Sequence, residues 1–192
     1  MRAIFEDRAR LQRMLDFEAA LARTQAALGV IPTLATDKIV QAARPERYDL
    51  ARLAEDATST GDIAITLVDA LAAEVAKTDP EAASYMHWGA ASKDLIDTTL
   101  MIELRLAIDA LLVDLDRAID AFTSLAGRHR RTATVGRANL QHTLPMPFGL
   151  KVAGYAVALA RAGAIAKAAQ GSAGAATGRA GHHVGLARRT RD

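Results

Sequence analysis

Near the start of the chain, apolar residues recur three, four and seven positions apart, with charged residues between them. This spacing places the apolar side chains on one face of a helix and predicts an amphipathic α-helix. Gly29 followed by Pro32 is a typical helix-ending pair. The apolar face consists of Leu11, Met14, Leu15, Leu21 and Leu28. Shorter helices are predicted over about 36–43, 49–57 and 61–77.

The middle of the chain predicts a much longer helix. From Asp94 to about Arg130 there is no proline, and Leu, Ile, Val and Ala occur on nearly every side of the helical wheel. At a rise of about 1.5 Å per residue this helix is roughly 50 Å long, and its broad apolar coverage requires other helices around it. A second apolar helix is predicted from Phe148 onward, after an irregular polar segment over 132–147. The two helices predict part of a helical bundle.

Composition agrees with an all-α fold. Ala and Leu are abundant and aromatic residues make up 4% of the chain, a balance that favours helices over sheets. After residue 160 the periodicity fades and glycines recur, which predicts a disordered or weakly helical segment. The expected division is an N-terminal helical region (1–90), long helices of an incomplete central bundle (91–168) and a disordered Ala/Gly/Arg-rich tail (169–192).

The net charge of +2 is unevenly distributed along the chain. Six of the 24 Lys and Arg residues, but one of the 22 Asp and Glu residues, follow residue 160, so residues 1–160 carry a net charge of −3. A basic tail attracts polyanions nonspecifically, but no recognisable nucleic-acid reading motif accompanies it. We therefore expect no nucleic-acid partner.

The chain contains no cysteine, so disulfides and thiolate metal sites are excluded, and we expect no metal site. Residues 1–8 become charged too early for a signal peptide. No run of eighteen uncharged apolar residues occurs. The sequence predicts a soluble, cytoplasmic protein without a membrane partner.

A first cluster of polar and ring residues precedes the long helix. Its sequence is His87-Trp88-Gly89-Ala90-Ala91-Ser92-Lys93-Asp94. Ser92 or Asp94 can cap the helix, and the free N–H groups at a helix N-terminus can hold a carboxylate. The alternative is that these two residues are only caps, while His87 and Trp88 only pack the loop.

A second cluster lies between the two long helices. It concentrates Arg, Asn, Gln, His and Lys, which are donors for an anionic ligand. The alternative is a polar turn between helices, with Pro145 and Pro147 starting the next helix. The donors in this cluster include Arg137, Asn139, Gln141, His142 and Lys151.

Both clusters resemble motifs of one enzyme family, in the same order. The first resembles the string His-Trp-Gly-Ala-Thr-Ser-Gln-Asp, and the second resembles Gly-Arg-Thr-x-x-Gln-His-x-x-Pro followed by Phe-Gly-Leu-Lys. The segments Ala3–Phe5 and Met14–Ala22 are similar to the first helix of the same family. The resemblance extends up to residue 160 and is to the 3-carboxy-cis,cis-muconate cycloisomerases of the fumarase/aspartase superfamily.

The resemblance implies a homotetramer with a central bundle of long helices and active sites assembled from three subunits. It implies that 3-carboxy-cis,cis-muconate, a tricarboxylate, is closed to a carboxymuconolactone in protocatechuate breakdown through the β-ketoadipate pathway, without a cofactor or metal. Such a reaction needs a proton at the carbon beside a carboxylate, and donors for the charge that develops there.

Individual residues match the family motifs. His142 is the candidate acid/base, and His87 is its nearest rival. Trp88 resembles the cycloisomerase form of the first motif more closely than the lyase forms, which favours ring closure over elimination. The candidate substrate-binding residues are Ser92, Arg137, Gln141 and Lys151.

Two alternatives remain open. One is a lyase of the same superfamily that releases fumarate, although Asn139 stands where many lyases have His and cycloisomerases tend to have Trp. The other is a non-catalytic helical fragment, because the family's Ser-containing Gly-Ser-Ser-x-Met-Pro-type loop and C-terminal helical domain do not follow residue 168. On this expectation the chain is the N-terminal part of a longer enzyme.

Overall fold

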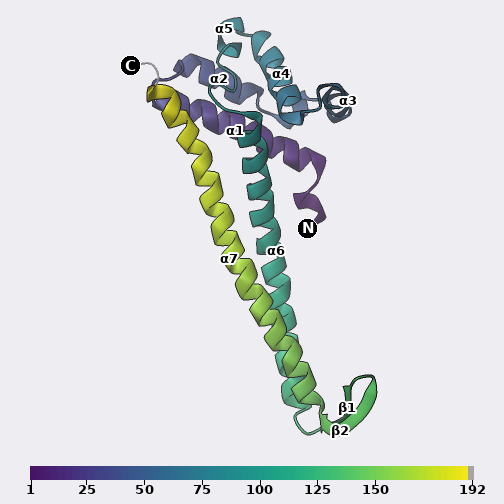
Figure 1. Ribbon diagram of the computed structural model, residues 1–192. Coiled ribbons are helices and arrows are strands. Elements are labelled where there is room, and N and C mark those ends of the chain that lie inside the picture. The colour runs from purple at the N-terminus through teal and green to yellow at the C-terminus, as the bar shows by residue number, and fades with distance from the viewer. Residues whose placement is uncertain (190–192) are drawn as a thin grey trace. The chain divides into compact units, whose positions relative to one another are not determined.

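The computed structural model describes residues 1–189, and beyond residue 171 it describes the backbone alone. Most of these residues lie in helices (Figure 1). In chain order the elements are η1 (Arg2–Ile4), α1 (Asp7–Ala27), α2 (Thr33–Ala42), η2 (Pro45–Arg47), α3 (Leu50–Thr60), α4 (Ile63–Ala76), α5 (Pro80–Ala83), α6 (Ser92–Arg128), β1 (Ala133–Ala138), β2 (Gln141–Pro147) and α7 (Phe148–Arg189). The all-α prediction is confirmed, with one two-stranded sheet added in the described part of the chain.

Two compact units divide the chain inside α6. The N-terminal unit contains residues 1–105, and the hairpin unit consists of residues 106–172. The sequence-based division instead places a boundary after residue 90, shortly before the predicted start of the long helix at Asp94. That division stays a prediction.

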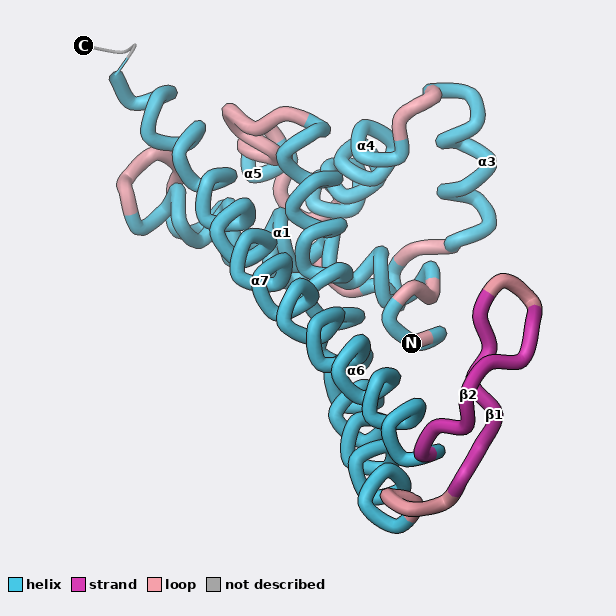
Figure 2. The backbone as a smooth tube through the Cα atoms, turned by 60° about the horizontal axis from the view of Figure 1, so that its bottom comes forward, coloured by secondary structure: helices cyan, strands magenta, loops and turns pink. Residues whose placement is uncertain are grey.

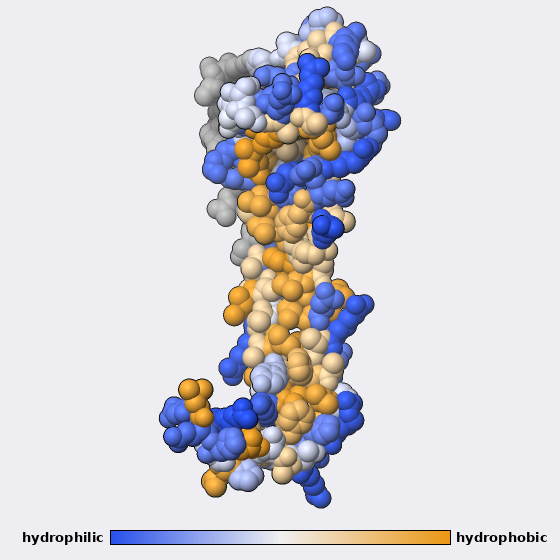
Figure 3. Space-filling view, turned by 90° about the vertical axis from the view of Figure 1, so that its right-hand side faces the viewer, coloured by the Kyte–Doolittle hydropathy of each residue, from blue (hydrophilic) through white to orange (hydrophobic). Residues whose placement is uncertain are grey.

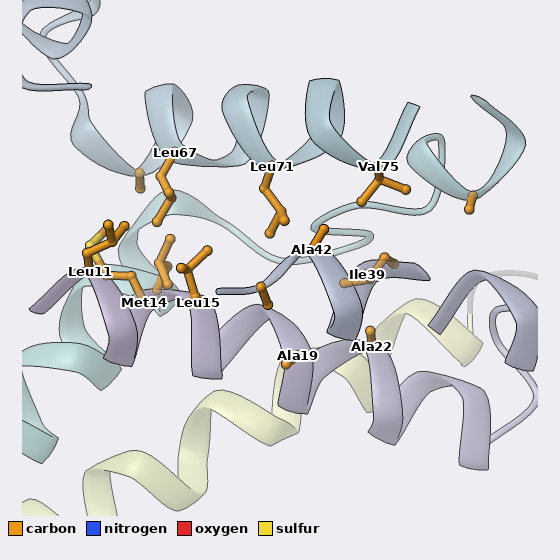
Figure 4. Packing of buried hydrophobic residues seen from close by; sticks show 14 of the residues in the cluster. Leu11, Met14, Leu15, Ala19, Ala22, Ile39, Ala42, Leu67, Leu71 and Val75 are labelled. Carbon is orange, nitrogen blue, oxygen red and sulfur yellow. The ribbon is translucent and has the colours of Figure 1, made fainter. Parts of the chain in front are cut away.

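Apolar side chains of α1 and α4 face each other in the core of the N-terminal unit. Figure 4 shows Leu11 and Leu15 of α1 pointing toward Leu67 and Leu71 of α4, and all four are buried. Ile39 of α2 belongs to the same buried cluster. Because burying one leucine side chain stabilises a fold by about 2 kcal/mol, this cluster is the main source of stability in the unit.

Aspartates and glycines set the ends of the shorter helices. Asp62 caps α4 by accepting hydrogen bonds from the N–H groups of Ala64 (2.8 Å) and Ile65 (3.3 Å), as N-cap residues typically do. Gly29 and Gly61 each have a φ of 70°, the left-handed conformation that glycine adopts at a helix end with least strain. The predicted end of the first helix at Gly29 is confirmed.

A buried ion cluster joins the first part of α6 to α1. The Glu103 side chain is 1% exposed, and its two oxygens accept hydrogen bonds from Arg10 at 3.0 and 2.8 Å. Arg13 donates to the same carboxylate at 3.3 Å and to the carbonyl of Ile4 at 2.8 Å. A buried carboxylate is tolerated only with such partners, so this cluster attaches the first part of α6 to α1 within the N-terminal unit.

In the hairpin unit, α6 and α7 lie side by side (Figures 1 and 2). The rings of Phe122 and Tyr155 are 5.9 Å apart between centroids. Gly149 lies against the end of α6, since a Cβ atom at this position would lie 2.5 Å from the carbonyl oxygen of Ala126. The close approach of the two helices therefore requires glycine here.

The segment between α6 and α7 is a β-hairpin, and the prediction of an irregular turn is wrong (Figure 2). β1 and β2 pair antiparallel, with Ala133 opposite Pro147 and Arg137 opposite His142. Pro145 and Pro147 argue against a strand. A two-stranded sheet consists entirely of edges, however, where a missing N–H donor is tolerated.

Many apolar residues of the hairpin unit are exposed, and Figure 3 shows apolar side chains gathered along α6 and α7. The exposed ones include Leu111, Val113, Leu150, Tyr155, Val157 and Ile165. One described helical segment, Phe148–Gly171, is long and apolar enough to cross a membrane by length and composition, a criterion that core helices of soluble proteins also meet. An exposed apolar surface of this size is typical of an interaction surface.

The backbone of α7 continues through the segment for which the sequence predicts disorder or weak helix, and it ends at Arg189. Over residues 169–189 the backbone is therefore helical. This agrees with the high helix propensity of alanine, which is frequent there. The end of the predicted tail, 190–192, lies outside the described residues.

Candidate active site

His87 lies between α5 and α6 and has an unusual backbone conformation. Its φ is 50°, in the left-handed region that residues other than glycine rarely adopt. Gly89 has a φ of 70°, and the carbonyl of Trp88 accepts a hydrogen bond from the side chain of Gln25 at 2.5 Å. Strain of this kind costs about 1–3 kcal/mol and persists where surrounding contacts fix the backbone. The hydrogen bond from Gln25, a residue of α1, is one such contact.

The ring of His87 forms a buried pair with Glu18 of α1. His87 Nδ1 and Glu18 Oε1 are 2.6 Å apart, and the two side chains are 14% and 1% exposed. Burial acts to lower the pKa of His87, but the hydrogen bond and charge of Glu18, helped by the backbone of Ala91 and the charge of Asp94, raise it overall. The imidazole is therefore protonated more readily than a free one, which suits a group that donates to an anion.

Ser92, the first residue of α6, interacts with Asp62, the N-cap of α4. Burial acts to raise the pKa of Asp62, but hydrogen bonds from two backbone N–H groups and from the Ser92 hydroxyl lower it overall. Asp94 accepts a hydrogen bond from the N–H of Ala91 at 2.9 Å. Of the two predicted caps, Asp94 thus satisfies the backbone at the start of the helix, while Ser92 interacts with a side chain of another helix end.

In the hairpin, Arg137 and His142 are directly opposite each other on β1 and β2. Directly paired residues leave the same face of a sheet with their Cα atoms about 5 Å apart. Gln141 pairs with Ala138, and successive residues of a strand point to opposite faces. The hairpin therefore brings Arg137 and His142 together and directs Gln141 to the other face.

The pairing of the hairpin is fixed at its turn and at a bulge within β1. Asn139 and Leu140 have φ values of 49° and 63°, which is the backbone of a two-residue turn between twisted strands. A bulge interrupts the pairing beside Gly136, where a Cβ atom would lie 2.5 Å from the hydroxyl oxygen of Thr143. A side chain at Gly136 would therefore disturb the register that sets the opposed pair.

The six candidate residues belong to two different units. His87 and Ser92 lie in the N-terminal unit, where both help to lower the pKa of Asp62. The hairpin unit contains the other four candidates, including Lys151, which is exposed in the first turn of α7. Across the part of the chain that the structure describes, no group of three His, Asp or Glu residues is placed to hold a metal ion.

The sequence analysis did not identify Glu18, Gln25 or Asp62. A signal was available for the first two, because Leu11, Glu18 and Gln25 are spaced by seven residues along the buried face of α1. A charged or amide residue within an apolar stripe indicates a buried polar contact. Asp62 follows Gly61, and the sequence alone identifies it only as a helix cap.

Comparisons with known proteins place these residues in a family. A sequence profile of the family described as lyase matches residues 1–190. The chain is 60% identical over 162 residues to the 3-carboxy-cis,cis-muconate cycloisomerase of Bradyrhizobium diazoefficiens. This alignment covers 84% of this chain and 36% of that protein. It is also 44% identical over 153 residues to the nitrosuccinate lyase of Streptomyces davaonensis, in an alignment that covers 80% of this chain and 32% of that protein.

The fold also resembles a solved structure. The crystal structure of 3-carboxy-cis,cis-muconate lactonizing enzyme from Pseudomonas putida is similar with a TM-score of 0.82 and 44% identity, over 86% of this chain and 38% of that one. The chain thus spans 32–38% of the length of these three relatives. The predicted fumarase/aspartase type of fold is confirmed, and by the match over residues 1–190 the chain belongs to the lyase family.

Proposed function

We propose that this protein is a 3-carboxy-cis,cis-muconate cycloisomerase that forms a carboxymuconolactone in protocatechuate degradation through the β-ketoadipate pathway. The observation that carries the proposal is the 60% identity to the Bradyrhizobium enzyme over 162 residues. In a chain of 192 residues, an alignment of that length includes residues 87–151 wherever it begins. Both candidate motifs therefore lie within the matched stretch.

The reaction is an isomerisation in which the substrate supplies the nucleophile. A carboxylate oxygen bonds to a carbon of the diene, and a proton is added to the adjacent carbon, next to another carboxylate. No electrons are gained or lost overall, so no cofactor is needed. We assign the proton transfer to His142, with His87 as the alternative. Arg137, paired with His142 on the hairpin, then stabilises the negative charge that develops on the neighbouring carboxylate.

The remaining candidates bind the substrate carboxylates. Arg137 and Lys151 provide positive charge, while Ser92 and Gln141 provide neutral hydrogen-bond donors. Ser92 lies at the N-terminus of α6, where the helix dipole favours a bound anion. A tricarboxylate is therefore a suitable ligand for this set of donors.

We propose further that the protein is a homotetramer whose sites combine residues from different copies. In support, the candidate residues of the hairpin are exposed, and so are Leu140 (104%) and Leu144 (84%) of the same hairpin. Helices of other copies would cover the exposed apolar residues of α6 and α7, as in other helical bundles. A cytoplasmic location, with neither membrane nor nucleic acid as partner, belongs to this proposal.

The proposal is tested by a spectrophotometric assay of the purified chain with 3-carboxy-cis,cis-muconate, in which loss of the conjugated diene is followed. We expect turnover that is abolished by His142→Ala and retained by His129→Gln, a control at a histidine outside both motifs. Turnover that survives His142→Ala and is lost in His87→Ala would move the acid role to His87. A folded, helical chain that neither turns over nor binds the tricarboxylate would contradict the proposal and support a non-catalytic fragment.

A lyase activity is the second candidate, and the 44% identity to nitrosuccinate lyase favours it. Trp88 and Asn139 argue for ring closure, because the first resembles the cycloisomerase motif and the second replaces a lyase-type histidine. The two candidates differ in their products. Release of fumarate from a substituted succinate, with no loss of the muconate diene, would establish the lyase.

A further inference from the structure

Glu18 has no role in the proposed reaction, yet its side chain contacts His87. Nδ1 of the imidazole and Oε1 of the carboxylate are 2.6 Å apart, the short distance of a charge-assisted hydrogen bond. An ionised carboxylate can only accept hydrogen bonds. When Glu18 is ionised, the ring must therefore carry a proton on Nδ1.

The backbone around His87 holds the ring in place for this contact. His87 itself has a φ of 50°, and the side chain of Gln25 binds the next carbonyl at 2.5 Å. Glu18 and Gln25 are one heptad apart on α1, so one helix face holds both the side chain and the backbone of the loop. The ring of Phe17 lies 6.5 Å from the imidazole between centroids. Three contacts of different kinds, from Glu18, Gln25 and Phe17, thus act on the position of one ring.

The other nitrogen of the ring is enclosed by the fold and is not hydrogen-bonded to any described residue. Within the described part of the chain, Nε2 of His87 and Oε2 of Glu18 are buried and have no hydrogen-bond partner. Buried polar atoms of native proteins are almost always paired, and an exception calls for an explanation. An imidazole fixed through Nδ1, with Nε2 free, is the arrangement by which a histidine is presented to a ligand.

Three carboxylates act on His87 or are affected by its charge, each from a different helix end or face. Glu18 comes from α1, Asp62 from the start of α4 and Asp94 from the first turn of α6. Asp62 accepts hydrogen bonds from two backbone N–H groups at a helix start, and Asp94 accepts one, so both carboxylates already have partners of their own. The carboxylate of Glu18 instead has the imidazole as its partner, so its charge acts most directly on the ring.

We infer that Glu18 is a positioning residue, whose carboxylate keeps a proton on Nδ1 of His87 and thereby makes Nε2 the atom that meets the ligand. The identity of that ligand as a tricarboxylate rests on the proposed function, but the tautomer of His87 does not. In the protonated ring, Nε2–H donates to a substrate carboxylate. In the neutral ring, Nε2 has a lone pair and accepts a proton. Glu18 thus sets both roles without contacting the substrate.

The inference is tested by ¹⁵N NMR of histidine-labelled chain, with the His87 signals assigned by their loss in His87→Gln. We expect the neutral ring of the wild type to be the Nδ1–H tautomer. We expect its pKa to fall by at least about one unit in Glu18→Gln, where the charge is removed. The matched control is Asp16→Asn, which removes a carboxylate from the exposed side of α1 and should leave the His87 titration unchanged.

Three results would overturn the inference: an Nε2–H tautomer in the wild type, an unchanged pKa in Glu18→Gln, or an equal shift in Asp16→Asn. If Glu18→Gln does not fold, as judged by circular dichroism, the wild-type tautomer decides on its own. Adding 3-carboxy-cis,cis-muconate should move the Nε2 signal of the wild type. An Nδ1–H tautomer without that response would leave the role of Glu18 intact and count against the proposed substrate.

Discussion

The two units present their candidate residues in opposite ways. In the N-terminal unit, the partly buried His87 is paired with the fully buried Glu18, and the next carbonyl of its loop is held by Gln25. In the hairpin unit, the pairing of β1 and β2 fixes the backbone of Arg137 and His142, but both side chains are exposed. One half of the proposed site is thus preorganised by the chain itself, whereas the other half needs a second surface to exclude water from it.

This difference has a consequence for mutations. Where functional groups are buried and charged, a substitution changes folding and function together, because a buried partner is left unpaired. Where functional groups are exposed on a fixed backbone, a substitution can change function alone. Substitutions in the N-terminal unit should therefore lower the free energy of unfolding more than substitutions in the hairpin unit.

The largest effect is expected at Glu103 in the N-terminal unit. Glu103→Gln leaves Arg13, whose side chain is 14% exposed, without its charged partner, and we expect the free energy of unfolding to fall by about 4 kcal/mol. Urea denaturation followed by circular dichroism measures this change. The control Glu46→Gln breaks the exposed pair with Arg8 and should cost at most about 1 kcal/mol. Similar losses in both variants would show that burial does not distinguish the two pairs.

The next effect concerns apolar side chains. Leu71 is completely buried, so Leu71→Ala should lower the free energy of unfolding by about 3 kcal/mol through lost contacts and a cavity. Leu150 in the hairpin unit is 62% exposed, and Leu150→Ala should change the stability of the monomeric chain by at most about 0.5 kcal/mol. Thermal or urea unfolding at a concentration at which the chain is monomeric makes the comparison. An equal loss at Leu150 would contradict the exposure of this face.

The helices could be predicted from the sequence because their signals are local: apolar periodicity gives the face, and Gly29 gives the end of the first helix. The hairpin could not, since Asn139 and Leu140 form a turn that usually contains glycine, and prolines occupy the second strand. His87 was identified through its motif. Its partner Glu18 lies 69 positions away in the sequence, and periodicity alone does not show which distant group a charged residue on a buried face will meet.

The Glu18–His87 pair predicts a specific pH dependence of stability. Because the pKa of His87 is raised, the stability that the pair contributes is fully present below the ordinary histidine value of about 6.5 and is lost as pH rises through the higher folded-state value. We expect this contribution to decrease as pH rises from about 6.5 toward 9. The difference in unfolding free energy between wild type and His87→Asn at each pH isolates it. A difference that grows with pH would be the opposite of the expected result.

The smallest effect should have the opposite sign and lies at the tip of the hairpin. Leu140 has a φ of 63° and a fully exposed side chain, so leucine strains the turn and gains no burial within the chain. Leu140→Gly relieves that strain and, after the entropic cost of glycine, should stabilise the hairpin by about 0.5 kcal/mol. Hydrogen exchange of the hairpin amides measures this gain.

Leu144→Gly is the matched control for Leu140→Gly, because it removes another highly exposed leucine from β2, where no positive φ is relieved. It should destabilise the hairpin by about 0.5 kcal/mol. Destabilisation by both variants would mean that Leu140 supports the hairpin itself. A more stable Leu140→Gly hairpin that no longer assembles or turns over would instead mean that the exposed leucine serves a contact with another copy. The strained turn would then serve assembly and not folding. This would agree with the contrast between the two units, in which the hairpin needs a second surface.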